Sequence, residues 1–414
     1  MNIGFVGLGK LGLPCALAID AVNEHSVKGY DPDERISDYL NNGEIPYREE
    51  GTAELLKNHN ISFTNLQEVI ESSEIIFVPI QTPHDPLYDG ITRLPETRVD
   101  FDYSYLVEGL KQISEVLDNL QEEKIVVVIS TVLPGTIESQ IKPILSKYVR
   151  LCYNPFFIAM GTTINDFLNP EFVLMGIDDK DAAHKLKLFY KTLHNKEVFE
   201  CTLDEAELIK VSYNTFITMK ICLANTVAEM SHKLHNINSD KVMDALKLAN
   251  QRLISDKYLN GGMGDGGGCH PRDNIALSWL SQKVDLSYDW YENLMISREK
   301  HTEWLAELTI QKSIEKQMEI FILGKSFKKE TNLTNGSPAY LLKHLIEEKN
   351  HETKIYDPFI DNKIEEFNEP RVFFIATNHD IFKDISFPAG SVVIDPWRMI
   401  DEQERVELIS IGVS

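Results

Sequence analysis

A cysteine that follows a run of glycines is the residue in this chain with the clearest capacity for covalent chemistry. Six glycines lie within residues 261–268, directly before Cys269. Glycine lets the backbone turn tightly and approach a ligand closely, so a thiol on this loop could meet a bound substrate. Asp273, four residues later, could steer a water molecule or hold a neighbour. The local sequence leaves a second interpretation equally open, in which the loop is flexible and the cysteine incidental.

A second glycine motif follows the first predicted strand, residues 3–6, and opens a predicted helix over residues 13–22. Glycines in this position allow a tight turn and a close approach of the pyrophosphate to the helix N-terminus. Asp31 ends the next strand, where a carboxylate would bond the ribose hydroxyls and favour NAD over NADP. The alternative is a strand, turn and helix without a ligand. The predicted NAD contacts in the motif are Gly7, Gly9, Lys10, Leu11 and Gly12.

Two threonines lie at the ends of later predicted strands. Strands over residues 74–80, 125–130 and 149–153 alternate with helical stretches, which indicates a parallel α/β sheet. Ligands bind at the carboxyl ends of such strands, and Thr82 and Thr131 lie there. Thr131 is therefore a candidate water or cofactor contact, although it could equally cap the following helix.

A long helical pattern over residues 204–234 carries two polar residues that could stabilise an oxyanion. Asp204 is the expected N-cap. Lys210 and Asn214 are four residues apart, so both project from one face of the helix. Most helical lysines are merely solvated, but the apolar surroundings favour a role for Lys210 in a site. Another helix, over residues 242–253, leads through Arg252 and Lys257 into the glycine loop.

Strands and helices alternate again from Glu319 onward. A strand over residues 319–323 precedes Gly-Lys-Ser-Phe-Lys-Lys at 324–329, whose lysines would suit a diphosphate. Glu319 stands where a phosphate loop of the NTPase type needs its first glycine, so that motif is absent. The fold class predicted is α/β, with two Rossmann-like doubly wound parallel-sheet domains joined by a central long-helix domain.

Composition limits the classes of partner. The formal charge of −23 on 414 residues argues against nucleic acid and against an anionic membrane surface. The five cysteines show no zinc-type spacing, so we expect no metal site and no disulfide framework, and a reducing cytoplasm. The first strand begins immediately after Met1, so we expect no signal peptide.

Taken together, these motifs resemble the UDP-glucose/GDP-mannose dehydrogenase family over nearly the whole chain. The markers are residues 7–12, Thr-Pro at 82–83, Ser-Thr-Val at 130–132, Glu-Leu-Ile-Lys at 207–210 with Asn214, 264–273, 324–329 and Tyr-Asp-Pro at 356–358. The resemblance implies NAD-dependent oxidation of a nucleotide sugar's primary alcohol to a carboxylate, with UDP-glucose as the commonest family substrate. It also implies a homodimer through the central helix. The expected domains are 1–198 for NAD, 199–300 for dimerisation and the cysteine loop, and 301–414 for the nucleotide sugar.

The resemblance also assigns roles to individual residues. Cys269 would form a thiohemiacetal and then a thioester, while Lys210 and Asn214 bind the oxyanion. Asp273, together with Thr131, would position the hydrolytic water. Further residues match substrate contacts of the family, with Arg252 reaching a neighbouring subunit: Asn154, Arg252, Lys257, Tyr258, Gly264, Lys328 and Arg398.

The chain departs from the family where an acid/base glutamate is expected. Phe156 and Met160 replace both glutamates of the motif that begins at Asn154, and the Asn-Pro-Glu-Phe at 169–172 does not align. Asn335 also replaces a family arginine. Either Asp273 suffices for hydrolysis, or the sugar differs from glucose, or the last step is slow. A two-electron hydroxy-acid dehydrogenase and a non-catalytic nucleotide-sugar binder remain the alternative functions.

Overall fold

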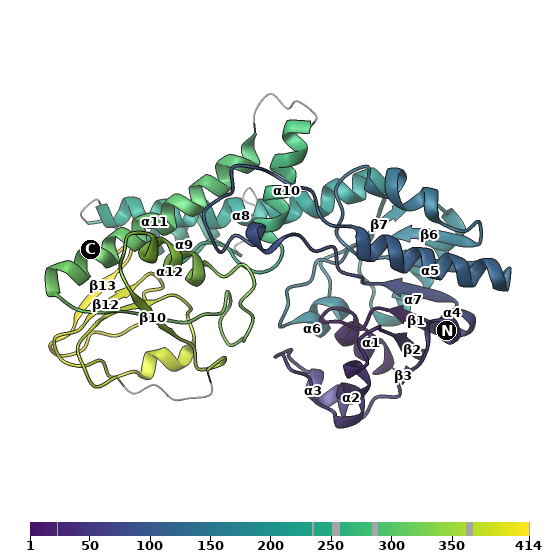
Figure 1. Cartoon of the computed structure of the whole chain (residues 1–414), viewed down its shortest axis with the longest axis horizontal. Coiled ribbons are helices and arrows are strands. Elements are labelled where there is room, and N and C mark those ends of the chain that lie inside the picture. The colour runs from purple at the N-terminus through teal and green to yellow at the C-terminus, as the bar shows by residue number, and fades with distance from the viewer. Residues whose placement is uncertain (23, 234–235, 251–256, 284–288, 362–366, 414) are drawn as a thin grey trace. The chain divides into compact units, whose positions relative to one another are not determined.

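The computed structural model describes the chain except at residues 23, 234–235, 251–256, 284–288, 362–366 and 414 (Figure 1). The described residues form two compact units, Met1–Pro83 with Phe101–Ser212, and His84–Asp100 with Tyr213–Ser414. The boundary falls within α8, Leu203–Lys233. The three-part division at residues 198 and 300 stays a prediction.

The first unit is built on a mostly parallel sheet. Its described strands have the order β3-β2-β1-β4-β5-β6-β7-β8, and only β6 and β7 among these pairs run antiparallel. The strands are β1 (Asn2–Val6), β2 (Ser26–Tyr30), β3 (Ser62–Phe63), β4 (Ile75–Val78), β5 (Lys124–Val128), β6 (Val149–Tyr153), β7 (Val173–Ile177) and β8 (Val198–Cys201). The helical segments before α8 are α1 (Gly12–Asp20), α2 (Arg35–Asn42), α3 (Thr52–Leu56), α4 (Leu66–Ser72), α5 (Ser104–Leu120), η2 (Ile137–Ile141), η3 (Lys142–Ile144), α6 (Thr163–Leu168) and α7 (Lys180–Leu193).

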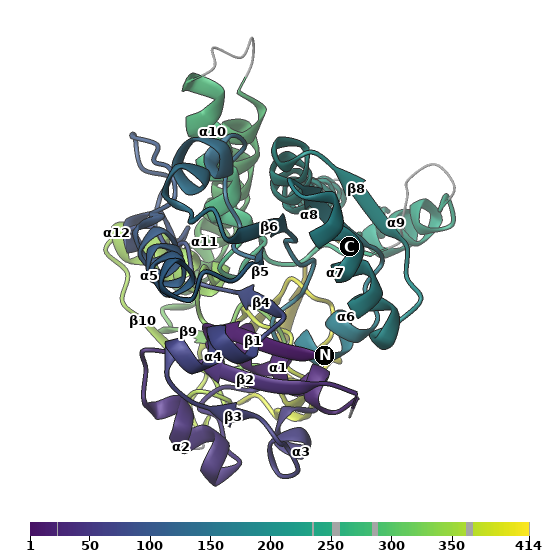
Figure 2. The ribbon, with the colours of Figure 1, turned by 90° about the vertical axis from the view of Figure 1, so that its right-hand side faces the viewer.

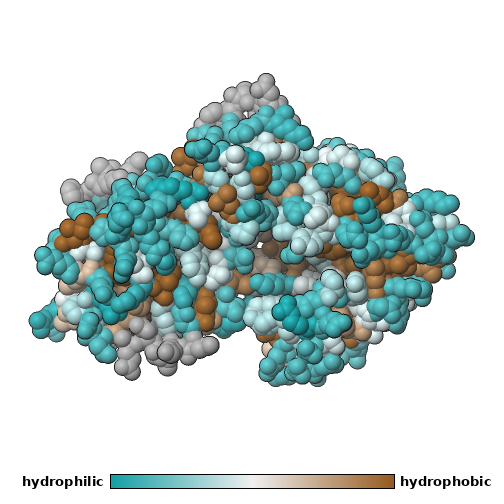
Figure 3. Space-filling view, in the orientation of Figure 1, coloured by the Kyte–Doolittle hydropathy of each residue, from teal (hydrophilic) through white to brown (hydrophobic). Residues whose placement is uncertain are grey.

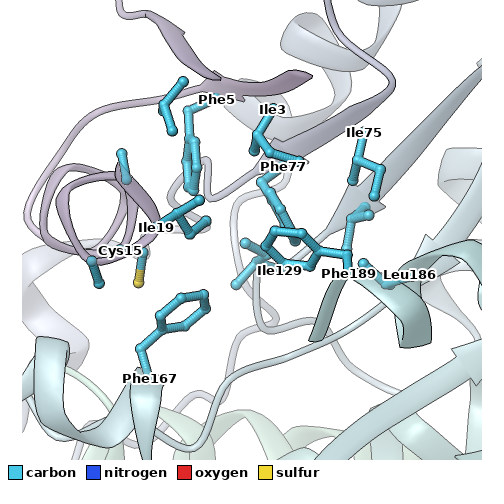
Figure 4. Close-up of a cluster of buried hydrophobic side chains, with 14 of the residues drawn as sticks. Ile3, Phe5, Cys15, Ile19, Ile75, Phe77, Ile129, Phe167, Leu186 and Phe189 are labelled. Atoms are coloured by element: carbon cyan, nitrogen blue, oxygen red, sulfur yellow. The ribbon is translucent and has the colours of Figure 1, made fainter. Parts of the chain in front are cut away.

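Helices cover both faces of this sheet because successive strand residues point to opposite sides. Ile3 and Phe5 enter a buried cluster with side chains from α1, α6 and α7, including Phe167 and Phe189 (Figure 4). Gly4 faces the other way, where a Cβ would lie 2.5 Å from Ser73 Oγ at the end of α4. Figure 2 shows α4 and α5 on the side of the sheet away from α1. This is the doubly wound arrangement that the sequence predicted.

The second unit carries a smaller, wholly parallel sheet. Its described strands have the order β10-β9-β11-β12-β13, with α11 and α12 packed on one face and phenylalanine side chains filling the other. The strands are β9 (Ile320–Leu323), β10 (Thr353–Tyr356), β11 (Val372–Ile375), β12 (Val392–Asp395) and β13 (Glu407–Ser410). The helical segments are η1 (Pro86–Tyr88), α9 (Ser239–Lys247), α10 (His270–Lys283), α11 (Trp290–Lys316), α12 (Pro338–Glu348) and η4 (Asp380–Asp384). The predicted pair of parallel-sheet domains with a long helix is therefore confirmed.

The same type of turn follows the first strand in sequence of each sheet, β1 and β9. Gly7 after β1 and Gly324 after β9 have φ of +114° and +101°, a conformation that L side chains rarely adopt. The Gly7 and Gly324 amides donate to a tyrosine carbonyl at the end of the adjacent strand, at 2.8 and 2.7 Å. The aspartate after that tyrosine, Asp31 or Asp357, accepts the next amide of the turn at 2.7 Å. The two domains thus share one device for shaping a loop at a strand end.

The limits of two predicted helices were wrong. Asp204 is not the N-cap of α8, because Thr202 Oγ1 accepts the amide of Glu205 and the Glu205 carboxylate accepts the amide of Thr202. This reciprocal pair is a capping box, and it places the cap two residues earlier than predicted. The helix predicted over 242–253 is α9, which begins at Ser239 and ends at Lys247, and residues 251–256 lie outside the described residues.

Polar residues predominate on the face drawn in Figure 3, with hydrophobic residues scattered among them. Within the described part of the chain, no helix has the length and apolar character that a bilayer crossing needs.

Candidate active site

The turn after β1 leaves open space beside one of its glycines. A Cβ on Gly12 would lie 2.2 Å from the Gly7 carbonyl oxygen, so the start of α1 packs against the turn itself. A Cβ on Gly9, by contrast, would meet no atom within 4 Å. Lys10 is exposed, and Leu11 directly precedes α1. A diphosphate can therefore approach the backbone at Gly9 and the N-terminus of α1.

Asp31 holds this turn through hydrogen bonds and can also accept hydrogen bonds from a ribose. Its Oδ2 accepts the amide of Leu8 at 2.7 Å, and its Oδ1 accepts the amide of Asp33 at 2.9 Å. The residue is only partly buried. Each carboxylate oxygen has a second lone pair, so both remain able to accept a ribose hydroxyl. The residues of this turn fit a dinucleotide.

Thr82 and Thr131, the predicted contacts at the strand ends, are hydrogen-bonded to each other. Thr82 Oγ1 donates to the carbonyl oxygen of Thr131 at 2.8 Å, and Ser130 Oγ donates to the carbonyl of Ile80. Thr131 does not cap the next helical segment, because that segment, η2, begins after Thr136. The structure thus brings Thr82 and Thr131 together at the carboxyl ends of neighbouring strands.

Lys210 is buried against the segment that has lost the glutamates. Its side chain is 7% exposed, and its Nζ donates to the carbonyl of Phe156 at 2.8 Å. The same ammonium lies 5.2 Å from the centre of the Phe157 ring. Lys210 therefore has a fixed position beside the residues that replace the expected acid/base motif.

Asn154 directly follows Tyr153, the last residue of β6, and is 1% exposed. Its side-chain nitrogen donates to the carbonyl of Leu174 at 2.7 Å, and its side-chain oxygen accepts the hydroxyl of Tyr190. Asn154 is therefore committed to bonds within the first unit.

Glu207 is a buried carboxylate one turn before Lys210 on α8. It is fully buried, and it accepts the amides of Gly135 at 2.7 Å and Ile137 at 2.8 Å. Burial raises the pKa of Glu207 to about 7, although these two hydrogen bonds act in the opposite direction. Glu207 thereby ties α8 to the segment that follows Thr131.

The second unit gathers the remaining catalytic candidates at the start of α10. Asp273 is fully buried and accepts hydrogen bonds from Asn214 on α8 and from Arg272, whose Nε and Nη2 lie 3.0 and 2.9 Å from Oδ1. The amide of Asp273 donates to the carbonyl of Cys269 at 2.8 Å, which closes the first turn. Cys269 itself is exposed and is not part of a disulfide. An accessible nucleophile therefore stands one helical turn from a buried, hydrogen-bonded carboxylate.

The glycine loop before Cys269 is anchored by a buried ion pair. Arg298 Nε lies 2.6 Å from Asp265 Oδ1, and both side chains are almost fully buried. The same guanidinium donates to the carbonyls of Asp265, Gly90 and Gly336. Thr218 on α8 donates to Asp265 Oδ2 at 2.8 Å. One arginine thus joins the loop to two other segments of the second unit.

Close packing explains the first glycines of the loop better than flexibility does. A Cβ on Gly262 would lie 2.3 Å from the Trp397 ring. Asn225 on α8 accepts the amide of Gly262 at 2.9 Å and donates to the carbonyl of Met263 at 3.2 Å. Among the glycines of residues 261–268, only Gly268, next to the cysteine, would place a Cβ with no atom within 4 Å. The loop is therefore held along its length and open at Cys269.

The acidic anchor of the loop after β9 is more deeply buried than that of the loop after β1. Asp357 is fully buried, and its Oδ2 accepts the amides of Lys325 and Ser326 and the ring Nε2 of His379 at 3.1 Å. Burial alone would raise the pKa of Asp357, but the hydrogen bonds, led by that of His379, hold it below its usual value. A buried carboxylate cannot reach a ribose, so the loop offers backbone and lysines, including Lys328, to a ligand.

The remaining predicted substrate contacts differ in their exposure. Tyr258 is 42% exposed with a φ of +62°, and Lys257 beside it is exposed. The guanidinium of Arg398 is held by Asp240, at 2.8 and 2.9 Å, and by three backbone carbonyls, one of them in the glycine loop. Gly264 faces the stem of Arg298. Arg252 lies outside the described residues.

Sequence reasoning missed Arg298 and the buried role of Glu207. Arg298 lies in a helix with many charged residues, and nothing in its local sequence distinguishes it from a solvated arginine. Glu207 was placed in the first turn of a helix, where a carboxylate is common on the surface. Its hydrogen-bond partners lie about 70 residues earlier in the chain, so no local sequence pattern predicts these contacts.

Comparison with known proteins gives matches over almost the whole chain. The NAD binding domain model of the UDP-glucose/GDP-mannose dehydrogenase family matches residues 1–194, and the central domain model of that family matches residues 204–297. UDP-glucose 6-dehydrogenase of Rickettsia conorii is 25% identical over 99% of this chain and 93% of its own. GDP-mannose 6-dehydrogenase of Azotobacter vinelandii is 27% identical over 87% of this chain and 82% of its own.

A solved structure agrees with the fold. UDP-glucose dehydrogenase from Pyrobaculum islandicum has a TM-score of 0.84 and 22% identity, covering 100% of this chain and 98% of that one. The match of the first unit to an NAD binding domain confirms the predicted cofactor, which the open turn at Gly9 and the carboxylate of Asp31 also fit.

We predict that Gly9→Ala weakens NAD binding without unfolding the protein. The added methyl group meets no protein atom within 4 Å, but it would fill the open space that the pyrophosphate is expected to approach, so the dissociation constant for NAD should rise at least about tenfold. Titration followed by NADH fluorescence and a thermal unfolding curve measure the two effects. Gly12→Ala is the contrasting variant, since its methyl group clashes with the Gly7 carbonyl and should lower the unfolding temperature. Unchanged NAD affinity in Gly9→Ala would contradict the assignment.

We predict that the stability gap between wild type and Glu207→Gln shrinks as pH rises. Between its ordinary pKa of 4.5 and about 7, folded Glu207 keeps a proton that the unfolded chain releases, so wild-type stability falls through this window. Glutamine does not titrate, and the gap in unfolding free energy should narrow by roughly 2 kcal/mol from pH 5 to pH 8. Denaturant unfolding at both pH values measures it. The exposed Glu54→Gln is the control, and a gap independent of pH in Glu207→Gln would refute the prediction.

Proposed function

Because the chain belongs to the UDP-glucose/GDP-mannose dehydrogenase family, we propose that it oxidises the primary alcohol of a nucleotide sugar to a carboxylate with two NAD. The observation that carries the proposal is the exposed thiol of Cys269, one turn before the buried Asp273 that Asn214 holds. An accessible cysteine next to a fixed polar cluster suits covalent capture of an aldehyde.

The proposed reaction has three stages at the carbon that bears the alcohol. The turn after β1 would hold NAD, which would accept the hydride in both oxidations. After the first, the Cys269 sulfur bonds to the aldehyde carbon to give a thiohemiacetal, whose oxidation gives a thioester. Water then adds to the thioester carbon, the carbon–sulfur bond breaks, and a carboxylate and a free thiol result. Capture by sulfur keeps the reactive aldehyde on the protein between the oxidations.

Polar groups of α8 would stabilise the oxyanions of these stages. Lys210 and Asn214 lie four residues apart on one helix, and each is at most 7% exposed. Fixed donors in a buried setting stabilise developing negative charge more strongly than water does. Asp273 is held rigidly by Arg272 and Asn214, so its proposed role is to fix the amide of Asn214 and the first turn of α10. Thr131 is the proposed water contact on the side of the cofactor.

The proposed substrate is UDP-glucose, although the relatives of this chain also include proteins named for GDP-mannose. The loop after β9 would bind the diphosphate through backbone amides and Lys328. Arg398 also supports the start of the glycine loop, because its Nη2 donates to the carbonyl of Gly261 at 2.9 Å. Arg252 would be supplied to a neighbouring subunit. The other proposed substrate contacts are Lys257, Tyr258, Gly264 and Arg398. Asn154 is not among them, because its side chain is buried and both of its polar atoms are hydrogen-bonded within the first unit.

We predict two NADH per sugar consumed. Purified protein is incubated with NAD and separate UDP- and GDP-sugars, and NADH absorbance is compared with residual sugar. A ratio of one would favour the two-electron alternative. No NADH with any sugar would favour the non-catalytic binder, the alternative based on the replacement of the motif glutamates by Phe156 and Met160. Cys269→Ser should abolish the two-NADH reaction, because a hydroxyl group forms the corresponding adduct far less readily than a thiol. Normal two-NADH turnover in that variant would refute the role of Cys269.

We also propose a homodimer through α8. Phe216 and Leu223 on this helix are 38% and 50% exposed, and Met219 and Val227 between and after them are partly exposed. These residues recur at spacings of three and four, so they form one apolar stripe along the helix. A second copy of the same helix is the occupant that such a stripe fits best.

We predict that Leu223→Glu converts a dimer to a monomer. A buried, unpaired carboxylate in the stripe opposes association, so the mass in light scattering should fall from twice 47.3 kDa to that value. Leu248→Glu, at a leucine that is 84% exposed outside the stripe, should leave the dimer intact. A wild-type protein that is monomeric at micromolar concentration would contradict the proposal.

A further inference from the structure

His84 lies in a turn that packs on α10, the helix that directly follows Cys269. The segment 84–100 belongs to the second unit, and within it Tyr88 joins a buried cluster with Ile275 of α10. Gly90 lies against Pro271 at the first turn of α10, and its carbonyl accepts Arg298 Nη1 at 2.9 Å. The turn that carries His84 is thereby fixed beside the residues that follow Cys269.

The hydrogen bonds of His84 determine which ring nitrogen carries the proton. Nε2 lies 2.9 Å from the carbonyl oxygen of Tyr88, which can only accept, so Nε2 must be the donor. The carboxylate of Asp89 lies 3.5 Å from the same nitrogen. In the neutral ring Nδ1 therefore holds the lone pair. An imidazole oriented through one nitrogen, with a carboxylate behind it, is the arrangement of a general base.

The charges around the ring come from the first turn of α10 and from its own turn. Burial lowers the pKa of His84, the charge of Arg272 lowers it further, and Asp89 and Asp273 oppose both effects. The imidazole of His84 is therefore close enough to α10 to feel the charges of Arg272 and Asp273, in the turn after Cys269. Its neutral, proton-accepting form predominates at neutral pH.

Asp273 is poorly placed to take the proton itself. Its Oδ1 is bonded to the guanidinium of Arg272 and its Oδ2 to the amide of Asn214. Both oxygens are therefore already engaged by donors, and the side chain is fully buried, so water has little access to either oxygen. Phe156 and Met160 also replace the two glutamates that the family resemblance leads us to expect. Hydrolysis of a thioester in this chain consequently needs another base.

We propose that His84 is the base that activates water for hydrolysis of the Cys269 thioester, an assignment that rests on the proposed function. Nδ1 takes a proton from water as the water oxygen bonds to the thioester carbon. The tetrahedral intermediate then collapses, the carbon–sulfur bond breaks, and the sulfur leaves as thiolate. The imidazolium returns its proton to that thiolate, and the carboxylic acid loses its own to solvent. No electrons are transferred in this stage.

The test is a rapid-quench experiment on full-length His84→Gln with NAD and a nucleotide sugar that the wild type oxidises. Glutamine retains a donor for the Tyr88 carbonyl but cannot accept a proton. We expect a burst of two NADH per active site, then a steady-state rate lowered about 100-fold. Mass spectrometry of the quenched protein should show the acyl adduct on Cys269. His184→Gln, at an exposed histidine, is the control and should keep the wild-type rate.

The pH profile provides a readout that a structural role would not change. The wild-type hydrolysis rate should fall as pH drops through the lowered pKa of His84, and this acid limb should be missing in His84→Gln. Wild-type turnover in His84→Gln, or slow turnover with only free thiol on Cys269, would overturn the assignment of His84 alone. Loss of the NADH burst in a variant with a wild-type unfolding temperature would also overturn it. If the wild type itself does not form two NADH per sugar, the proposed function fails instead.

Discussion

The hydrogen bond from Asn214 to the buried carboxylate of Asp273 is the interaction on which the candidate site depends. It joins the middle of α8 to the first turn of α10, and so fixes the start of the helix that follows Cys269. A carboxylate removed from water is costly unless it is paired, and Arg272 supplies the charge. Loss of Asn214, Asp273 or Arg272 would leave a buried polar group without one of its partners, so these three side chains act as a unit.

The same physical constraint recurs across the molecule. Glu207, Asp265 and Asp357 are buried carboxylates, and each accepts hydrogen bonds that hold a loop at the end of a strand or helix. Backbone amides at such loops need acceptors, and a carboxylate can satisfy more than one. Buried carboxylates thus hold the loops that contribute residues to the candidate site. Asp31 is the exception, because it remains partly exposed and can also meet a ligand.

Local patterns were sufficient for the fold. The strand, glycine turn and helix at residues 2–20, the long helix α8 and the second series of strands follow from hydrophobic runs and glycine positions alone. The helix start at Thr202 was missed because Asp204 is also a good N-cap residue and the capping box needs both Thr202 and Glu205 to be considered together. Predicted helix ends erred where the apolar pattern continued past the last turn.

Much less of the site could be predicted, because its contacts join residues far apart in the chain. The glycine loop suggested flexibility, yet Gly262 packs on Trp397 and Asp265 pairs with Arg298. His84 follows Thr82 and Pro83 directly, but only the packing of its turn on α10 relates it to the buried carboxylate there. The loss of the glutamates was visible in the sequence, whereas the residue that could compensate was not.

The central claim is that Cys269 forms a bond to the carbon being oxidised. A crystal structure with NAD and a nucleotide sugar bound tests this most directly. We expect Cys269 Sγ to lie within about 3.5 Å of the sugar carbon that bears the primary alcohol. A sulfur atom turned away from a well-ordered sugar, with that carbon beyond the reach of any rotamer of Cys269, would contradict it.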